Sequence, residues 1–341
     1  MIRRRTKPRI LPERLSVGAI LQKVGKETGI EVNLEPQWKI AGQIVTKSGK
    51  MRYFRSMALD LNTQGAAALA SDKDFAALFL RKMGYPVVEG EAFCAEDWAK
   101  EIGSDRDVRK AVRYAKKLKY PVIVKPNGAS QGKGVFLVYN EKELRGALKA
   151  IFAYDRIALV QKQVIGRDYR IVVLDGKIIS AYERIPLSVT GDGHSTIKTL
   201  LLKKQDLFKK QGRDTKIDLK DPRMKAKLAH QKIGLSYRPT PDERVTLLEN
   251  ANLSSGGDAV DVTSTLHPSW KKLAAQIAHD MNLRFTGIDV MVPNTLDVPP
   301  GDYRLLEVND SPGLDHYAAI GPAQKKVVED LYRAVLVAMA R

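Results

Sequence analysis

Two short apolar runs that flank a glycine-rich stretch constrain the fold of this chain more than any other feature. Residues 120–125 and 135–138 are rich in β-branched side chains, which favour strands. Between them lies Asn127-Gly128-Ala129-Ser130-Gln131-Gly132-Lys133-Gly134. The three glycines allow backbone N–H groups to approach a phosphate closely, and Lys133 adds positive charge. The pattern predicts two strands joined by a flexible hairpin loop that can cover an anion.

This loop differs from a Walker A loop, which has the form G-x-x-x-x-G-K-[ST] and leads into a helix. Here the glycine spacing is one residue shorter, Gly134 replaces the metal-binding hydroxyl residue, and a strand follows. A glycine-rich hairpin is often only a turn. Lys125 favours a ligand site, because an ammonium group at the end of an apolar strand is costly unless it meets an anion or an acid. The alternative is a lysine that extends to the surface.

Strands and helices alternate along most of the chain. Ser71 is the expected N-cap of a helix that runs to Gly84, with apolar positions at Phe75, Leu78, Phe79 and Met83. A second helix is expected from Asn140 through Ile151, a third over residues 268–282 and a last one from Pro322. Further strands are expected at residues 158–164, 169–174, 177–185, 287–292 and 303–308. This order predicts an α/β (α+β) architecture.

Three oxygen-bearing side chains occur within apolar strands near the C-terminus. Asp289 interrupts one strand, and Glu307 and Asn309 share one face of the next, because side chains alternate along a strand. If these strands pair, the three side chains converge. Mg²⁺ binds to such oxygens, usually through one or two carboxylates together with substrate phosphates. The alternative is a set of charged side chains at a sheet edge that face water.

Arg170 and Arg184 lie in two strands that Asp175-Gly176 joins by a tight turn, so their side chains can be close together. Paired arginines bind phosphate or carboxylate oxygens well. Two arginines on a solvated sheet face are the alternative.

Several motifs, taken in order, resemble the ATP-grasp superfamily of carboxylate-amine ligases. These motifs are Asp72-Lys73, Val124-Lys125-Pro126, the glycine loop, Gly166-Arg167-Asp168-Tyr169-Arg170, Gly287-Ile288-Asp289-Val290 and Glu307-Val308-Asn309-Asp310-Ser311-Pro312-Gly313. Arg184-Ile185-Pro186, and Asn252-Leu253-Ser254-Ser255-Gly256-Gly257 followed by Asp261-Val262-Thr263, resemble the ATP-grasp modules of cyanophycin synthetase and bifunctional glutathione synthetase. The resemblance covers residues 62 to about 320.

The resemblance implies an ATP-grasp fold, in which two α+β subdomains clasp ATP, and it implies a role for each matching residue. The phosphates of ATP would contact Lys73, Lys125 and the loop residues Gly128, Gln131, Gly132, Lys133 and Gly134. Gln161, Lys162 and Val164 would line the adenine hinge, and Asp168 would meet the ribose. Asp289, Glu307 and Asn309 would hold Mg²⁺, or Mn²⁺, beside the catalytic Arg170 and Arg184. The expected substrate residues are Asn252, Ser254, Ser255, Gly256, Gly257, Ser311 and Gly313.

Two departures from the family pattern matter. Gln161 stands where many relatives carry a glutamate, which affects the expected nucleotide preference. Cyanophycin synthetase continues into a second ligase domain, whereas this chain stops at Arg341, so we do not expect it to make that two-amino-acid polymer alone.

The expected domains follow the motifs. They are a small N-terminal leader domain (1–65), a linking helical region (66–118), a small ATP-grasp subdomain (119–165) and a large subdomain (166–341) with a basic lid at 187–257. The length of 341 residues suits two or three packed subdomains, because single cores stop growing at roughly 250 to 300 residues.

Composition narrows the function classes. The single cysteine, Cys94, excludes an intramolecular disulfide and a zinc site of CxxC pairs, which favours a reducing, cytoplasmic setting. No apolar run approaches the roughly 20 residues that cross a bilayer, so no membrane association is expected. The net charge of +18 fits nucleic acid, a membrane surface or an anionic small molecule. Much of it lies at residues 202–244, which are either a solvated surface or part of an acceptor site.

The main hypothesis is an ATP- and Mg²⁺-dependent ligase that joins an amino acid or short peptide, expected to be acidic, to a second substrate through an acyl phosphate. One alternative is a ligase that adds amino acids to a protein tail. Another is a basic nucleic-acid-binding protein, which residues 202–244 support poorly because they contain only two aromatic residues, Phe208 and Tyr237. The family resemblance also suggests a homo-oligomer.

Overall fold

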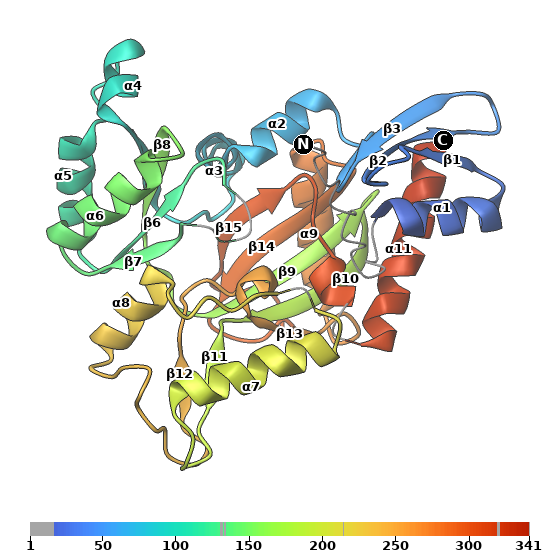
Figure 1. Ribbon diagram of the computed structural model, residues 1–341. Coiled ribbons are helices and arrows are strands. Elements are labelled where there is room, and N and C mark those ends of the chain that lie inside the picture. The colour runs from blue at the N-terminus through green and yellow to red at the C-terminus, as the bar shows by residue number, and fades with distance from the viewer. Residues whose placement is uncertain (1–16, 130–131, 133, 214, 319–320, 341) are drawn as a thin grey trace, which may run out of the picture.

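The computed structural model describes residues 17–129, 132, 134–213, 215–318 and 321–340. These residues form a mixed architecture of helices and strands, which confirms the fold class predicted from the sequence. Figure 1 shows a central sheet with a smaller sheet on one side, a lobe of helices and a two-stranded ribbon below, and an N-terminal sheet above. No helix in the described ranges is long and apolar enough to cross a membrane.

The central sheet has five antiparallel strands in the order β13-β10-β9-β14-β15. They are β9 (Arg167–Leu174), β10 (Lys177–Ile185), β13 (Asp258–Asp261), β14 (Phe285–Val292) and β15 (Arg304–Asn309). The predicted hairpin turn joins β9 to β10, and Asp175 and Gly176 have φ values of 46° and 74°, as a type I′ turn requires. On one face Ile171 and Ile288 share a core with α2 (Gln64–Ser71), α3 (Lys73–Lys82) and α9 (Pro268–Asp280), to which α9 contributes Trp270.

The other face of the central sheet changes character along its strands. At one end Val172 and Phe285 pack against α11 (Pro322–Ala340) in a second core. Because side chains alternate along a strand, Arg170 and Asp289 lie further along on this same face. The face therefore has an apolar half and a charged half.

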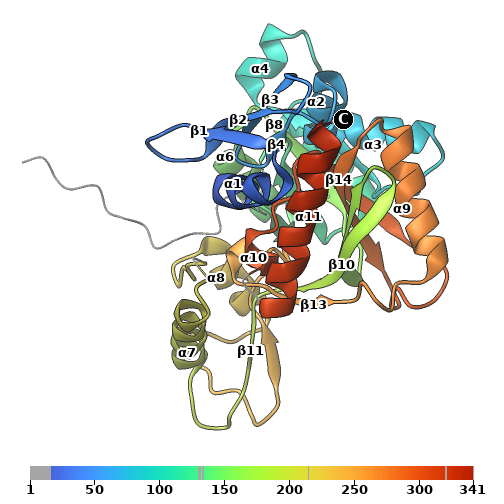
Figure 2. The same cartoon turned by 90° about the vertical axis from the view of Figure 1, so that its right-hand side faces the viewer.

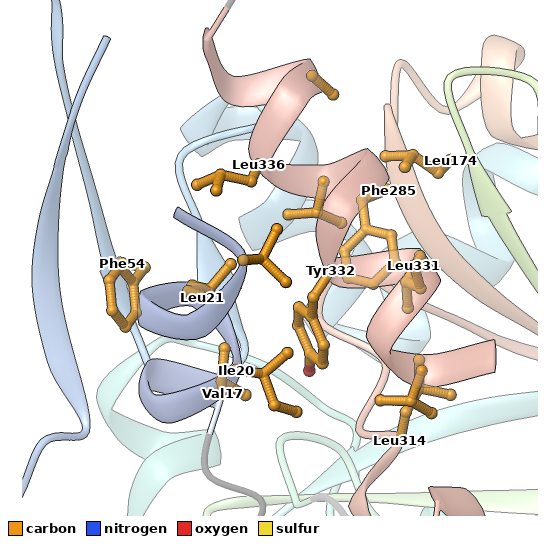
Figure 3. Close-up of a cluster of buried hydrophobic side chains, with 14 of the residues drawn as sticks. Val17, Ile20, Leu21, Phe54, Leu174, Phe285, Leu314, Leu331, Tyr332 and Leu336 are labelled. Atoms are coloured by element: carbon orange, nitrogen blue, oxygen red, sulfur yellow. The ribbon is translucent and has the colours of Figure 1, made fainter. Parts of the chain in front are cut away.

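The N-terminal residues share their core with the C-terminal helix. They form α1 (Val17–Thr28) and a four-stranded antiparallel sheet of β1 (Glu31–Leu34), β2 (Ala41–Val45), β3 (Met51–Arg55) and β4 (Ala58–Leu59). Figure 3 shows Leu21 of α1 and Phe54 of β3 in one cluster with Tyr332 and Leu336 of α11. The sequence suggested a separate leader domain. Such a short segment cannot bury enough apolar surface alone, and it completes its core on α11.

The smaller sheet has the order β5-β8-β6-β7. Its strands are β5 (Gly90–Cys94), β6 (Val122–Pro126), β7 (Phe136–Val138) and β8 (Ile157–Lys162). Residues of α5 (Val108–Leu118) and α6 (Glu141–Phe152) form a core with this sheet, and α4 (Glu96–Glu101) precedes α5. The boundary expected at residue 118 is wrong, because β5 pairs with β8 and residues 90–118 belong to this subdomain. Lys125 is followed in β6 by Pro126, which is the last residue of the strand.

The segment expected to be a lid, residues 187–257, has its own core. It contains β11 (Ser188–Thr190), α7 (Ile197–Lys210), α8 (Pro222–His230), β12 (Arg244–Thr246) and the 3-10 turn η1 (Leu253–Ser255). Ile197, Leu201, Met224 and Val245 are among its buried residues. Figures 1 and 2 both place α7 and β11 at the bottom of the molecule. A short helix, α10 (Asp315–Ala318), follows the central sheet.

Two expected helix starts have different outcomes. Asn140 caps α6 as predicted, and its side chain accepts a hydrogen bond from the Glu143 N–H at 3.0 Å. The expectation for Ser71 is wrong, because Ser71 is the last residue of α2. Asp72 caps α3 instead and accepts from the Phe75 N–H at 2.9 Å. Asp and Ser are both good N-caps. Because α2 extends through Ser71, Asp72 is the residue left to cap α3.

Candidate active site

A cavity of about 410 Å³ lies where the smaller sheet, the segment 187–257 and the charged half of the central sheet meet. Residues from each of the three regions line it. The residues expected at a functional site that line it are Lys73, Lys125, Gly128, Gly132, Gln161, Lys162, Val164, Asp168, Arg184, Asn252, Asp289, Glu307, Asn309 and Ser311. Segments that are far apart in sequence thus contribute to one cavity.

Strand register builds a charged cluster on the floor of this cavity. Asp289 lies opposite Arg170 on β9 and opposite Glu307 on β15, and Arg184 lies opposite Asp168. Arg170 donates from Nε to Asp289 Oδ1 and from Nη2 to Asp289 Oδ2, both at 2.6 Å. Arg184 Nη2 is 2.8 Å from Asp289 Oδ2 and 2.6 Å from Asp168 Oδ1. The two arginines converge on one carboxylate, as the tight turn between their strands suggested.

The arginines set the protonation of the buried carboxylates. Burial alone would raise the pKa of Asp289, but Arg170 and Arg184 outweigh burial and lower this pKa to about 2. For Asp168, burial prevails over Arg184, and its pKa is raised. Asp289 is therefore ionised throughout the neutral range, and both of its oxygens bind the two arginines.

Two lysines approach the floor from the smaller sheet and α3. Lys73, the first residue of α3, donates from Nζ to the backbone oxygens of Asn127 at 3.2 Å and Ala129 at 2.7 Å. Its Nζ also lies 3.9 Å from Glu307 Oε2. Burial lowers the pKa of Lys125 more than the nearby Glu307 raises it. Lys125 thus lies in a desolvated position that an anionic ligand would stabilise.

The charges on the floor nearly balance. Lys73, Lys125 and Arg184 line the cavity together with Asp168, Asp289 and Glu307, whereas the candidate Arg170 binds Asp289 but does not itself line the cavity. The carboxylates therefore offset most of the positive charge at the cavity. A polyphosphate bound here needs further positive charge, and a divalent cation is the usual source.

The chemistry of three side chains fits Mg²⁺. Asp289, Glu307 and Asn309 all line the cavity and offer oxygen atoms. The Asn309 amide donates from Nδ2 to the Gly287 oxygen at 3.3 Å, which leaves its Oδ1 as an acceptor. Within the described residues no group of three or more His, Cys, Asp and Glu side chains suits a metal ion. A magnesium ion at this place would rely on two carboxylates, one amide and oxygens of its ligand, which is its preferred mode of binding.

The glycine loop contacts the segment 187–257. Gly132 has φ of 66°, and a Cβ there would lie 2.2 Å from Asn252 Nδ2 and 2.3 Å from Asn250 Nδ2. Arg223 of α8 donates from Nη1 to the Gly132 oxygen at 2.6 Å. Gly134 also has positive φ, 71°, but does not line the cavity. The candidates Gln131 and Lys133 lie outside the described residues.

Three residues of this region were missed from the sequence. Asn127 is buried, and its Oδ1 accepts from the Asp74 N–H at 3.1 Å, which ties the loop to α3. Arg223 was seen only as one cation of the basic segment. Asn250 was not singled out, although it stands two residues before the candidate Asn252. No pattern of residue types marks these positions, because their contacts arise between separate subdomains.

The part of the cavity lined by the expected adenine hinge is partly apolar. Gln161, Lys162 and Val164 line it together with Val88 and Ile123. Gln161 is buried and pairs across the sheet with Gly90, where a Cβ would lie only 2.4 Å from Gln161 Cγ. A glycine opposite Gln161 therefore makes room for this side chain. Apolar walls beside a polar strand edge suit a flat heteroaromatic ring.

The expected substrate residues do not all reach the cavity. Asn252 and Ser311 line it, whereas Ser254, Ser255, Gly256, Gly257 and Gly313 do not. Buried Arg213 donates from Nη2 to the oxygens of Leu253 at 3.1 Å and Gly257 at 2.8 Å, so this turn packs into the base of the segment 187–257. Local sequence marked the turn, but tertiary packing directs it away from the cavity.

Two α+β subdomains enclose the cavity, with Lys125 of the smaller sheet and Lys73 of α3 near the carboxylates of the central sheet, and this arrangement is that of an ATP-grasp domain. The family described as D-ala D-ala ligase C-terminus matches residues 79–192. The chain is 32% identical over 262 residues to the glutathione biosynthesis bifunctional protein GshAB of Streptococcus mutans, covering 72% of this chain and 32% of that protein. It is 31% identical over 257 residues to the cyanophycin synthetase of Trichormus variabilis, covering 74% of this chain and 27% of that protein.

A solved structure has the same fold. The bifunctional glutathione synthetase from Pasteurella multocida superposes with a TM-score of 0.58 at 23% identity, over 95% of this chain and 44% of that chain. This chain spans about a third of the length of the GshAB and cyanophycin synthetase relatives. Residues 79–192 thus carry an ATP-grasp domain of the D-ala D-ala ligase C-terminus family, and the chain is homologous to GshAB and cyanophycin synthetase.

Proposed function

We propose that this protein is an ATP- and Mg²⁺-dependent ligase that forms an amide bond between a carboxylate and an amine. The observation that carries the proposal is the convergence in one cavity of Lys73 and Lys125 with the carboxylates Asp289 and Glu307 and with Arg184. This arrangement can neutralise a polyphosphate and a carboxylate that lie side by side, as phosphoryl transfer between them requires.

In the first step a carboxylate oxygen of the substrate attacks the γ-phosphorus of ATP, and the bond between that phosphorus and the bridging oxygen of ADP breaks. Lys73 and Lys125 would hold the phosphates, and Arg170 and Arg184 would stabilise the charge that moves onto the transferred group. Asp289, Glu307 and Asn309 would hold Mg²⁺, which supplies charge neutralisation for the phosphate oxygens when bound. The products of this step are ADP and an acyl phosphate.

In the second step the amine nitrogen attacks the acyl carbon, inorganic phosphate leaves, and the nitrogen loses one proton. The acyl phosphate reacts with water, so the cavity must be closed during the reaction. The segment 187–257 would act as the lid. The contact of Arg223 with Gly132 supports this role, because it brings that segment onto the glycine loop.

We propose amino acids or short peptides as substrates, with an acidic acceptor. GshAB and cyanophycin synthetase, by their names, make glutathione and cyanophycin, both of which contain amide bonds. The exposed cations of α7 and α8 favour an acidic group near the lid. Addition of amino acids to a protein tail remains the alternative within the same chemistry.

Nucleic-acid binding is less well supported. Stacking on bases needs exposed aromatic rings. Phe208 is buried, with the Arg213 guanidinium 3.9 Å from its ring centroid, and the Tyr237 hydroxyl donates to Glu243. The two aromatic residues of the basic segment thus have partners within the protein.

The proposal is tested by measuring ADP release with ATP, Mg²⁺ and pairs of amino acids or peptides, with mass spectrometry of the product. ADP release should require both an amine and a carboxylate, and equal release with neither would contradict the proposal. Glu307→Gln should lower the rate at least 100-fold, because it removes one anionic metal ligand. Glu183→Gln, on the same sheet but bound to Arg167 away from the cavity, is the matched control and should retain most of the activity.

A further inference from the structure

Asp310 lines the cavity and is held in place by three side chains. It directly follows Asn309, the last residue of β15. Ser71 donates from Oγ to Asp310 Oδ1 at 2.9 Å, and Ser311 donates from Oγ to Asp310 Oδ2 at 2.8 Å. Asn62 donates from Nδ2 to the Asp310 backbone oxygen at 2.9 Å. Neither the family resemblance nor the proposed reaction gives this carboxylate a role.

Asp310 differs from the other carboxylates of the cavity because it has no positive partner. The other acidic residues that line the described part of the cavity each form an ion pair with a lysine or an arginine, and they are Asp168, Glu249, Asp289 and Glu307. Among the residues that the structure describes, no cation pairs with Asp310. Two serine hydroxyls use only part of the roughly four acceptor positions of a carboxylate. The charge of Asp310 and its remaining acceptor positions are therefore available to a ligand.

The amine substrate of the proposed reaction needs such a group. An aliphatic amine is mostly an ammonium ion at neutral pH, because its pKa is above 7. Lys73, Lys125 and Arg184 line the cavity and repel this ion. An ammonium group therefore binds best to a carboxylate that no cation of the protein already neutralises. Within the described lining of the cavity, Asp310 meets this condition.

Asp310 also lies near the place where the amide bond would form. It follows Asn309, a proposed magnesium ligand, and its partner Ser71 stands two residues before Lys73, a proposed phosphate ligand. Helix α2, which ends at Ser71, lies against β15. Attack on the acyl phosphate requires the reacting atoms to be roughly 3 to 3.5 Å apart, so the amine must bind at this part of the cavity.

We infer, on the basis of the proposed ligase function, that Asp310 binds the ammonium group of the amine substrate. Ser71 and Ser311 orient the two carboxylate oxygens, and the ammonium group donates to their remaining acceptor positions before it loses a proton and attacks. The ligand class that fits is a primary amine, such as the α-amino group of an amino acid. A neutral nucleophile gains little from Asp310.

Two nucleophiles of different charge test this role. The cationic one is the amino acid that gives the fastest ADP release in the assay of the proposed function. The neutral one is hydroxylamine, which is mostly uncharged at neutral pH. Its nitrogen attacks the acyl carbon and loses one proton, phosphate leaves, and a hydroxamate forms. Asp310→Asn should raise the KM for the amino acid at least about tenfold, because it removes a hydrogen bond between two charged groups. The rate of hydroxamate formation should stay within about threefold of the wild-type rate.

Asp302→Asn is the matched control, because Asp302 is 72% exposed, pairs with Arg304 and does not line the cavity. It should leave both reactions within about threefold of wild type. Asp310→Glu, which keeps the charge, should recover part of the affinity for the amino acid.

Two results for Asp310→Asn would overturn the inference. An unchanged KM for the amino acid would show that Asp310 does not bind the amine. An equal loss of amide and hydroxamate formation would show that Asp310 acts on the first step, through the neighbouring Asn309 or the fold. A wild-type protein that forms neither product would instead contradict the proposed function itself.

Discussion

Arg170→Met is the most informative perturbation of the charged cluster. It removes both hydrogen bonds that Arg170 makes to Asp289 and leaves a methylene stem of similar length in place. Asp289 then depends on Arg184, which it shares with Asp168. Two carboxylates would compete for one guanidinium in a buried site, so the folded state should lose stability.

The expected cost follows from burial and from the pKa of Asp289. The Asp289 side chain is 1% exposed and that of Arg170 is 13% exposed. Removing one partner of a buried ion pair costs about 3 to 5 kcal/mol. The shift of the Asp289 pKa from 3.8 to about 2 corresponds to about 2 kcal/mol of stability, to which Arg170 is the leading favourable contributor. We therefore expect Arg170→Met to cost about 3 kcal/mol at pH 7.5.

The cost should depend on pH with a definite sign. The folded-state pKa of Asp289 is lowered, so its stabilisation is present above its ordinary pKa and is lost as pH falls from about 4 to about 2. In the variant this pKa rises, and Asp289 protonates in the folded protein at a higher pH. The difference between wild type and variant should therefore shrink below about 2 kcal/mol at pH 4.5.

Urea denaturation followed by circular dichroism at pH 7.5 and pH 4.5 measures both values. The matched control is Arg167→Met in the same strand, because Arg167 pairs with Glu183 but is 46% exposed. An exposed pair contributes less than about 1 kcal/mol, and this control should change little between the two pH values. Equal costs for the two variants at pH 7.5, or a cost of Arg170→Met that does not fall at pH 4.5, would refute the reasoning.

Two further substitutions test the loop and the shared core. Gly132→Ala should raise the KM for ATP severalfold, because its Cβ would lie within 2.3 Å of two asparagine side chains. The control is Gly103→Ala, since Gly103 has a similar φ of 64° and no atom lies within 4 Å of its added Cβ. This control should lower the free energy of unfolding by about 1 kcal/mol without changing KM. Steady-state kinetics and thermal unfolding distinguish these effects, and equal KM values would contradict the proposed contact. Leu21→Ala should lower the free energy of unfolding, measured by urea denaturation, by about 2 to 5 kcal/mol, because Leu21 is fully buried against α11. The control Val337→Ala, at a residue of α11 that is 38% exposed, should lower it by less than about 1 kcal/mol. Similar costs for these two would show that the N-terminal residues do not share a core with α11.

Local patterns predicted most of the elements. The β-branched runs gave β6 and β7 within one or two residues, and Asn140 gave the start of α6. These features depend on neighbouring residues only. The apolar spacing also predicted α3, but Phe75, Leu78, Phe79 and Met83 are exposed in the structure, because helical periodicity detects an apolar stripe without telling what covers it.

The sequence by itself determined the alternation of strands and helices, the glycine loop, and the identity of most of the charged residues that line the cavity. These follow from spacing along the chain and from motif order. Only the tertiary structure decided that Arg170 and Arg184 both bind Asp289, since strand register sets these contacts. It also brought Arg223 and Asn250 to the glycine loop and placed the turn at residues 254–257 outside the cavity. The physical reason is that contacts between distant segments depend on how separate cores pack together, which no local pattern of residue types encodes.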